Sequence, residues 1–333
     1  MKPSQLASLL EKTISAKLPV LVTGAPGIGK SDIVKQAAEK AGADYYIEFP
    51  AISDPTDGKG LPVVGNGTGT ATWLQFERHK IYCNTQKLSV VVLEDMGQAA
   101  MSVQASYMQW VLARRIGDVA ISPHVAFVAC TNRRTDKAGV QGLLEPVKSR
   151  FASIVNLDVD LNDWIKWALA NNLPTELIAF VKFRPELLHD FKASNDLVNS
   201  PSPRTIANVG RLMGIGLPLE IEHECFAGAA GEGFAAEFRG FLQLFRTLPN
   251  PDLVFLNPTG AMVPSDPATL YALCSAISRK VTDQNISRFV QYIDRIPDEF
   301  SVFAMRAATA KKVELLQTRA SIEWHSKHDD VLI

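Results

Sequence analysis

The sequence predicts an α/β fold built on a parallel sheet, followed by a mostly helical second half. Short apolar runs alternate with helical apolar spacings in the first half of the 333 residues, which is typical of a parallel sheet with helical crossovers. The runs 90–93 and 125–130 are apolar throughout, as expected for strands buried on both faces. Strand signals fade after Asp158. We therefore expect three parts: an α/β domain over 1–158, a helical, lid-like domain over 159–250 and a helical extension over 251–333.

The first elements follow one another closely. Leu6, Leu9, Leu10 and Ile14 recur at helical spacing and predict an opening helix. The apolar run 19–23 predicts a strand that stops at Gly24, and a helical apolar face follows the glycine-rich turn. Later elements are expected as strands at 45–49, 90–93, 125–130 and 153–157, and as a helix marked by Met101, Ala105, Met108 and Leu112. The segment 53–72, rich in glycine and threonine, is expected to be an inserted hairpin.

Composition argues against several classes of protein. Lys and Arg number 34 against 35 Asp and Glu, whereas a dedicated nucleic-acid binder usually shows a basic excess. No apolar run approaches the roughly 20 residues of a membrane helix, and the N-terminus lacks the apolar core of a signal peptide. The four cysteines form no C-x-x-C pair and are expected to be reduced thiols. We therefore expect a cytoplasmic protein with no membrane partner.

The most specific motif is the glycine-rich turn between the first strand and the second helix. It reads Gly24-Ala25-Pro26-Gly27-Ile28-Gly29-Lys30-Ser31 and fits the pattern G-x-x-x-x-G-K-[ST]. Glycines let backbone N–H groups curl around a phosphate, and the following helix directs its N-terminus at the anion. Lys30 would bring positive charge to the β- and γ-phosphates, and Ser31 would offer its hydroxyl to Mg²⁺. The motif in its strand–turn–helix setting predicts a site for ATP and Mg²⁺.

Polar side chains end the two fully apolar strands. Glu94 and Asp95 follow the run 90–93, and two adjacent acids at a buried strand end are costly unless a cation is near. We expect this pair to hold Mg²⁺ through water; a helix N-cap by Asp95 is the alternative. Asn132 follows the next strand, where its amide could orient the attacking water or touch the γ-phosphate, or could simply be a turn residue.

Four arginines are candidates for a contact with phosphate. Arg150 precedes the last predicted strand, and Arg204 follows Ser202-Pro203, a favourable N-cap and N1 pair. Arg114 and Arg115 end the helix after the acid pair. Because most arginines are solvated, residue type alone does not choose among them.

Together these motifs resemble those of the AAA+ ATPases, and within them the MoxR-like, dynein-related branch, over nearly the whole chain. The segments that carry the resemblance are Gly24–Ser31 (Walker A), Leu93–Asp95 (Walker B), Asn132 (sensor 1), Glu145–Phe151 (arginine-finger segment) and Ser200–Arg204 (sensor 2). The insertion is similar too, because Asp54-Pro55-Thr56-Asp57-Gly58-Lys59-Gly60-Leu61-Pro62 matches the D-P-x-D-x-x-G-x-P string of this branch's helix-2 insert.

The resemblance implies an AAA+ base domain, an α-helical lid and a helical C-terminal tail, with the nucleotide between base and lid. Subunits would form a ring, expected to be a hexamer. Arg150 would reach the γ-phosphate of the neighbouring subunit's ATP, and Arg204 would sense the nucleotide from the lid. Family members act as chaperone-like remodellers and often work with a protein that carries a von Willebrand factor type A domain. The insert would face that partner or the pore.

The order of the acid pair departs from the family pattern. Walker B usually reads Asp then Glu, whereas here Glu94 precedes Asp95. Either Glu94 takes the magnesium role and Asp95 the water-activating role, or the strand is shifted and Asp95 serves magnesium. Since placement errors near 1 Å can cost about 100-fold in rate, a nucleotide-gated scaffold with little turnover is an alternative function.

A nucleic-acid motor is a third candidate function. Its support is a modest local cluster of basic residues, Arg133, Arg134, Lys137 and Lys148. The near-neutral total charge argues against it. The client protein, the pathway, the ring size and the choice among Arg114, Arg115 and Arg150 as the residue acting in trans stay open from sequence.

Overall fold

The computed structural model describes residues 1–64, 69–136, 139–140, 142–194, 196–248, 251–310 and 312–328. The chain divides into two compact units, Met1–Asp160 and Leu161–Ile333. The sequence-based boundaries near 158 and 250 stay predictions. None of the described helices is long and apolar enough to cross a membrane.

The first unit is built on a parallel sheet of five strands in the order β2-β5-β8-β1-β9. The strands of this sheet are β1 (Val20–Thr23), β2 (Asp44–Glu48), β5 (Ser89–Leu93), β8 (Val125–Thr131) and β9 (Ser153–Asn156). The predicted strands are therefore confirmed. Because β8 lies between β1 and β5, the end of the P-loop strand, the end of the acid-pair strand and Asn132 come to the same edge of the sheet.

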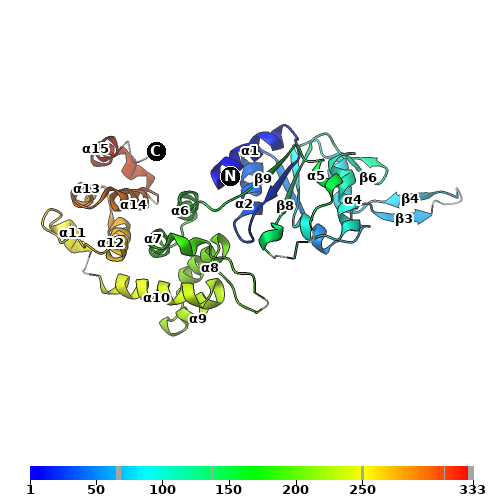
Figure 1. The fold of residues 1–333 in the computed structure, drawn as a ribbon. Coiled ribbons are helices and arrows are strands. Elements are labelled where there is room, and N and C mark those ends of the chain that lie inside the picture. Colours follow the sequence, from blue (N-terminus) through cyan, green and yellow to red (C-terminus); the bar gives the residue numbers. More distant parts are fainter. Residues whose placement is uncertain are drawn as a thin grey trace. The chain divides into compact units, whose positions relative to one another are not determined.

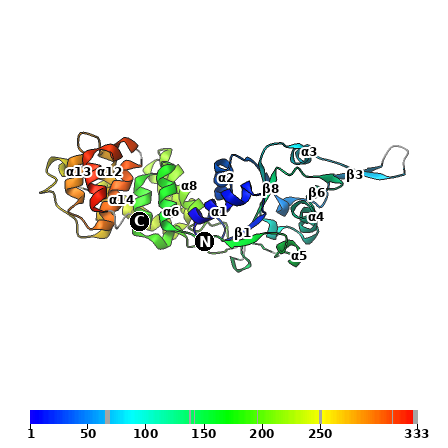
Figure 2. The same ribbon diagram turned by 90° about the horizontal axis from the view of Figure 1, so that it is seen from above.

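Helices cover both faces of this sheet (Figures 1 and 2). The helices of this unit are α1 (Pro3–Ser15), α2 (Lys30–Lys40), α3 (Glu77–Asn84), α4 (Met101–Val111) and α5 (Glu145–Lys148). Buried residues of α1 and α2 pack with Val90, Val92 and Val128 on one face. Buried residues of α3 and α4 pack with Val91 and Leu93 on the other. Successive side chains of a strand thus enter different cores, as the apolar runs predicted.

Helix α4 was predicted correctly, but its buried face differs from the apolar positions that marked it. Met101 is 60% exposed and Leu112 is 58% exposed, whereas Tyr107 and Trp110 are fully buried. The aromatic side chains can be buried because their polar atoms find partners: Trp110 Nε1 donates to Gly58 O, and Tyr107 OH lies 3.3 Å from Ser53 Oγ.

The predicted insertion forms an antiparallel hairpin of β3 (Leu61–Val64) and β4 (Ala71–Leu74), which projects from the first unit in Figure 1. A second small hairpin pairs β6 (Arg115–Ile116) with β7 (Val119–Ala120). The residues just before β3 are anchored in the unit, since Arg78 forms ion pairs with the carboxylates of both Glu48 and Asp57.

The regular elements among the described residues of the second unit are all helices, as expected. Its helices are α6 (Leu161–Ala170), α7 (Thr175–Phe183), α8 (Pro203–Gly214), α9 (Leu219–Ala230), α10 (Glu232–Thr247), α11 (Asp252–Leu256), α12 (Pro267–Lys280), α13 (Ile286–Ile293), α14 (Asp298–Thr309) and α15 (Arg319–Lys327). Helix α12 packs against both α7 and α10, so the predicted lid and extension share one core.

Candidate nucleotide site

The P-loop joins the end of β1 to the first residue of α2. Gly27 and Gly29 have φ angles of 73° and 92°, in the left-handed region that favours glycine. Gly24 is needed for space, because a Cβ there would lie 2.9 Å from Leu157 O. Ser31 lies in the first turn of α2 and is partly buried. The glycines therefore allow the turn that brings backbone N–H groups to a helix N-terminus, an arrangement suited to phosphate.

The Lys30 side chain connects the P-loop to the neighbouring strand. It is 6% exposed, and its Nζ donates to Gly24 O at 3.0 Å, Ala25 O at 2.9 Å and Asn132 Oδ1 at 2.7 Å. A buried ammonium needs such acceptors, because burying an uncompensated charge is costly. The lysine and asparagine that the sequence predicted to share a site are thus in direct contact.

Strand alternation places Glu94 on the face of the sheet that carries α2. Val90 and Val92 contact the α1–α2 core, and Glu94 continues that alternation beyond the end of β5. On β8, Cys130 occupies the same face and pairs with Val22 of β1. Burial, together with the nearby Glu94 carboxylate, raises the Cys130 pKa well above its usual value. A neutral thiol therefore lies beside the Glu94 carboxylate at the base of the site.

Asp95 occupies a special backbone position directly after Glu94. Its φ of 52° and ψ of 36° fall in the left-handed region, which Asp tolerates better than most residues. Its Oδ1 accepts hydrogen bonds from Gln98 Nε2 at 2.9 Å and from Asn132 Nδ2 at 3.5 Å. Lys30, Asn132 and Asp95 thus form one hydrogen-bonded series across three elements. As an N-cap, the Asp95 side chain would accept a hydrogen bond from the backbone of the following turn, and no such bond is present among the described residues.

The donor set suits magnesium rather than a softer metal. Ser31 offers a hydroxyl and Glu94 a carboxylate, and Mg²⁺ prefers oxygen ligands and usually keeps waters and phosphate oxygens. No group of three or more His, Cys, Asp or Glu side chains within the described parts of the chain could hold a metal ion. A magnesium ion held by Ser31 and Glu94 would take phosphate oxygens and waters as its further ligands.

The arginine candidates have different surroundings. Arg150 is partly buried, and its Nη1 donates to Pro146 O. Arg114 donates to Ser122 O at 2.7 Å and lies over the Phe127 ring, while the exposed Arg115 donates to Asp118 O. Arg204 lies in the second unit, with an exposed side chain in the first turn of α8. The roles of these arginines stay predictions.

Two residues near the site carried no motif in the sequence. Gln98 bonds Asp95, and Thr131 Oγ1 lies 3.4 Å from Gln98 Oε1. Thr131 is adjacent to Asn132, and Gln98 follows Asp95 by three residues, a spacing that a one-turn 3-10 helix brings into contact. Their positions, Thr131 at the end of β8 and Gln98 shortly after β5, were the signal that the sequence offered.

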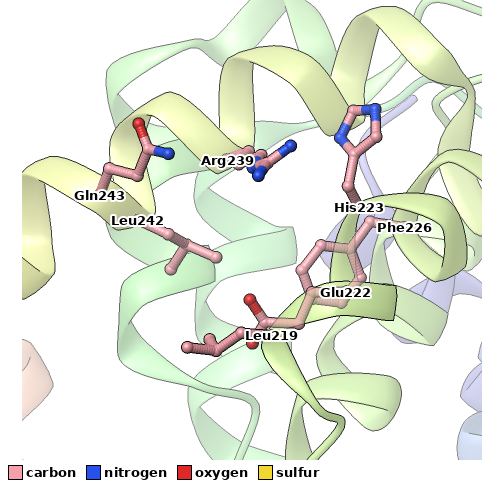
Figure 3. Close-up of a pocket in the computed structure, with 7 residues that line it drawn as sticks. All are labelled: Leu219, Glu222, His223, Phe226, Arg239, Leu242 and Gln243. Atoms are coloured by element: carbon pink, nitrogen blue, oxygen red, sulfur yellow. The ribbon is translucent and has the colours of Figure 1, made fainter.

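Each unit has a pocket, and the pocket of the first unit includes Asn132 in its lining. One of about 320 Å³ adjoins Asn132 and is lined by Leu21 and Ile154 together with Arg133, Arg134 and Lys148, among others. The other, of about 170 Å³, lies between α9 and α10 in the second unit (Figure 3). Its lining combines apolar residues such as Phe226 with charged ones, including Glu222 and Arg239.

Comparisons with known proteins give only structural likeness. No family model matches the sequence, and no curated protein matches it. Solved structures that align include a proline-to-glycine mutant of RuvB from Thermotoga maritima, with 14% identity, a TM-score of 0.42 and coverage of 82% of this chain and 80% of that one. RuvB from the same organism, described as a Holliday junction branch migration motor, aligns with 14% identity, a TM-score of 0.40 and coverage of 88% and 86%.

These likenesses are too low to argue a substrate or a partner. The P-loop, the sheet order and the following helices carry the fold assignment. The chain has an α/β P-loop fold with a five-stranded parallel sheet, followed by a helical second unit. The predicted fold class is therefore confirmed, whereas the MoxR-like branch stays a prediction.

Proposed function

We propose that this chain binds Mg-ATP at the P-loop and hydrolyses it. The observation that carries the proposal is the 2.7 Å bond from Lys30 Nζ to Asn132 Oδ1. It brings the phosphate-binding lysine of one element to the polar amide that ends the next strand of the sheet. Glu94 lies on the same face, so an ammonium, an amide and a carboxylate lie together at one edge of the sheet.

Each side chain has a role in this proposal. Lys30 and the P-loop amides bind the β- and γ-phosphates, while Ser31 and Glu94 hold magnesium, which would neutralise charge on the phosphates. Asp95 accepts a proton from the attacking water, and Asn132 orients that water. The water oxygen bonds to the γ-phosphorus as the bond to the β,γ-bridging oxygen breaks, releasing ADP and phosphate.

The test compares two lysines on one helix. Lys30→Ala removes the phosphate contact, whereas Lys35→Ala makes the same change at an exposed position of α2. We expect Lys30→Ala to abolish Mg-ATP binding, measured with a fluorescent analogue, and phosphate release. Lys35→Ala should keep both within about twofold of wild type. Equal activity of the two variants would refute the proposal.

We further propose that the chain works as a ring, expected to be a hexamer, that remodels a protein partner. Support comes from the motif resemblance, including the Arg150 segment that would act in trans. A partner with a von Willebrand factor type A domain fits the same resemblance, and the exposed hairpin β3–β4 offers it apolar side chains such as Val64 and Leu74. Mass measurement with and without ATP tests the ring, since a monomer under both conditions would exclude it.

A nucleotide-gated scaffold is the second candidate function. The order Glu94-Asp95 favours it, because the water-activating side chain is one methylene shorter than the usual glutamate. A turnover of roughly 1 s⁻¹ or faster, ordinary for an enzyme, would decide for the ATPase. Tight Mg-ATP binding with turnover far below that value would decide for the scaffold.

A further inference from the structure

The segment after Asp95 folds back onto its carboxylate. Residues Met96–Gln98 form a single 3-10 turn, in which Gln98 N donates to Asp95 O at 2.9 Å. The Gln98 side chain bonds the same residue, with Nε2 at 2.9 Å from Asp95 Oδ1. Backbone and side chain of Gln98 therefore both hold Asp95, at a position where the backbone is left-handed.

The orientation of the Gln98 amide follows from its two neighbours, the Asp95 carboxylate and the Thr131 hydroxyl. Thr131 is 4% exposed, and its Oγ1 lies 3.4 Å from Gln98 Oε1 and 3.2 Å from Asn132 O. With Oε1 toward this hydroxyl, the NH₂ group faces the carboxylate. The reversed amide would set its carbonyl oxygen against the oxygen of Asp95, which is electrostatically unfavourable.

The backbone of the turn lies tightly against the end of β8. A Cβ on Gly97 would come within 2.3 Å of Thr131 Oγ1, so only glycine fits there without a shift. Gly142 N also donates to Gly97 O at 3.3 Å. These contacts fix the 3-10 turn relative to the strand, and with it the position of Gln98.

We infer that Gln98, oriented by Thr131, is a positioning residue that aims the Asp95 carboxylate at the attacking water. The inference rests on the proposed hydrolysis of ATP. Both amide donors, from Gln98 and Asn132, bind Oδ1 of Asp95, which assigns acceptance of the water proton to Oδ2. An aspartate reaches less far than a glutamate, so its placement needs external support, and errors near 1 Å can cost about 100-fold.

The test changes Gln98 while leaving the nucleotide contacts in place. Gln98→Met keeps the length of the side chain and removes both amide bonds. Gln109→Met is the matched control, because the Gln109 side chain donates to a backbone carbonyl, Gly117 O, near the C-terminal end of α4. For Gln98→Met we expect kcat to fall about 10- to 100-fold, with KM for ATP and the Kd of a fluorescent ATP analogue within about twofold of wild type. Gln109→Met should match wild type in all three.

A second pair of variants separates positioning from folding. Thr131→Val removes the hydroxyl that orients Gln98 and should lower kcat, whereas Thr131→Ser keeps the hydroxyl and should restore it. Gln98→Glu keeps the acceptor for Thr131 but offers no N–H to Asp95, and it should also lower kcat. A kcat of Gln98→Met within twofold of wild type would overturn the inference, as would a rise in KM and Kd that matches the loss in kcat.

A different measurement tests the proposed hydrolysis of ATP. Wild-type turnover that Lys30→Ala abolishes establishes the function, and normal turnover of Gln98→Met against that background overturns the positioning role alone. If wild type shows no Lys30-dependent turnover, the hydrolytic function and the positioning role fall together.

Discussion

Lys30 Nζ donates a hydrogen bond of 2.7 Å to Asn132 Oδ1, which joins two residues separated by 102 positions in the chain. The same asparagine directs its Nδ2 toward Asp95 Oδ1. An amide has one acceptor and one donor group, so Asn132 links the cation of the P-loop to the carboxylate after β5. The phosphate-binding and water-activating groups are therefore connected through a single side chain.

This link predicts the effect of removing the Asn132 side chain. Asn132→Ala should lower kcat by about 100-fold or more, as loss of one preorganised donor commonly does, while the affinity for ATP changes little. The matched control is Asn84→Ala, since the Asn84 side chain donates to a backbone carbonyl, Lys80 O, at the exposed end of α3. Phosphate release and nucleotide titration measure the two quantities. Equal kcat values for both variants would show that Asn132 has no role in hydrolysis.

The two acids predict different defects when each is neutralised. Glu94→Gln should abolish the tightening of ATP binding by magnesium, because Glu94 lies on the face of the sheet that carries Ser31. Asp95→Asn should keep magnesium-dependent binding and lose turnover by at least about 100-fold. Binding titrations with Mg²⁺ and with EDTA distinguish the two. The opposite pattern would mean that Asp95, and not Glu94, holds magnesium.

The two continuous apolar runs, each followed by polar residues, were enough to predict this side of the site. Val90 and Val92 on β5 and Val128 on β8 enter the α2-side core, so the residues after these strands fall on one face. The left-handed backbone of Asp95 was not predictable, nor was the close packing of Gly97 against Thr131 that follows it in the chain. The network of Gln98 and Thr131 follows from that packing, and no motif marks it.

The buried face of α4 shows a second limit of sequence patterns. Met101 and Leu112 are apolar but exposed, and Tyr107 and Trp110 are buried. Which side chains of α4 are buried depends on Ser53 and on the Gly58 carbonyl, which bond Tyr107 and Trp110. Both lie about 50 residues earlier in the chain. Periodicity within one helix cannot report partners that a distant insertion supplies.

The arginine predicted to act in trans has a test that uses mixed subunits. Arg150→Ala should bind ATP but lose about 1,000-fold or more in turnover, as expected for an arginine finger. Mixing it with Lys30→Ala protein should restore part of the activity, because the Lys30→Ala subunit can supply Arg150 to its neighbour. Arg204→Ala is the contrast, since a sensor acting in its own subunit gains nothing from such mixing. If mixing Arg150→Ala with Lys30→Ala protein restores no ATP turnover, Arg150 does not act in trans.

Two glycines predict stability changes of opposite sign. Gly97→Ala should destabilise the first unit by about 1–3 kcal/mol, because its Cβ would meet Thr131 Oγ1 at 2.3 Å. Gly240 lies inside α10, and a Cβ there meets nothing within 4 Å. Gly240→Ala should therefore stabilise the second unit by about 0.5–1 kcal/mol through helix propensity. Thermal melting of each variant measures the shift; a neutral Gly97→Ala would contradict the packing at the end of β8.

The buried histidine beneath the insertion predicts a loss of stability in acid. His79 is 0% exposed, packs against Phe76 and Trp110, and donates from Nε2 to Asp57 O over 2.8 Å. Burial lowers the pKa of His79 to about 4, with the Arg78 charge acting in the same direction. Neutral imidazole is therefore the form that the fold accepts.

The sign of the pH effect follows from that lowered value. Above the unfolded pKa of about 6.5, His79 is neutral in both states and costs nothing. As the pH falls from about 6.5 to 4, the unfolded chain binds a proton that the folded chain does not, and the free energy of unfolding drops by of order 3 kcal/mol at most. Urea unfolding at several pH values should show that His79→Gln, which retains an N–H donor, loses this part of the dependence. His124→Gln controls for the removal of one histidine, and a wild-type minus His79→Gln difference that stays constant between pH 4 and 6.5 would contradict a neutral, buried His79.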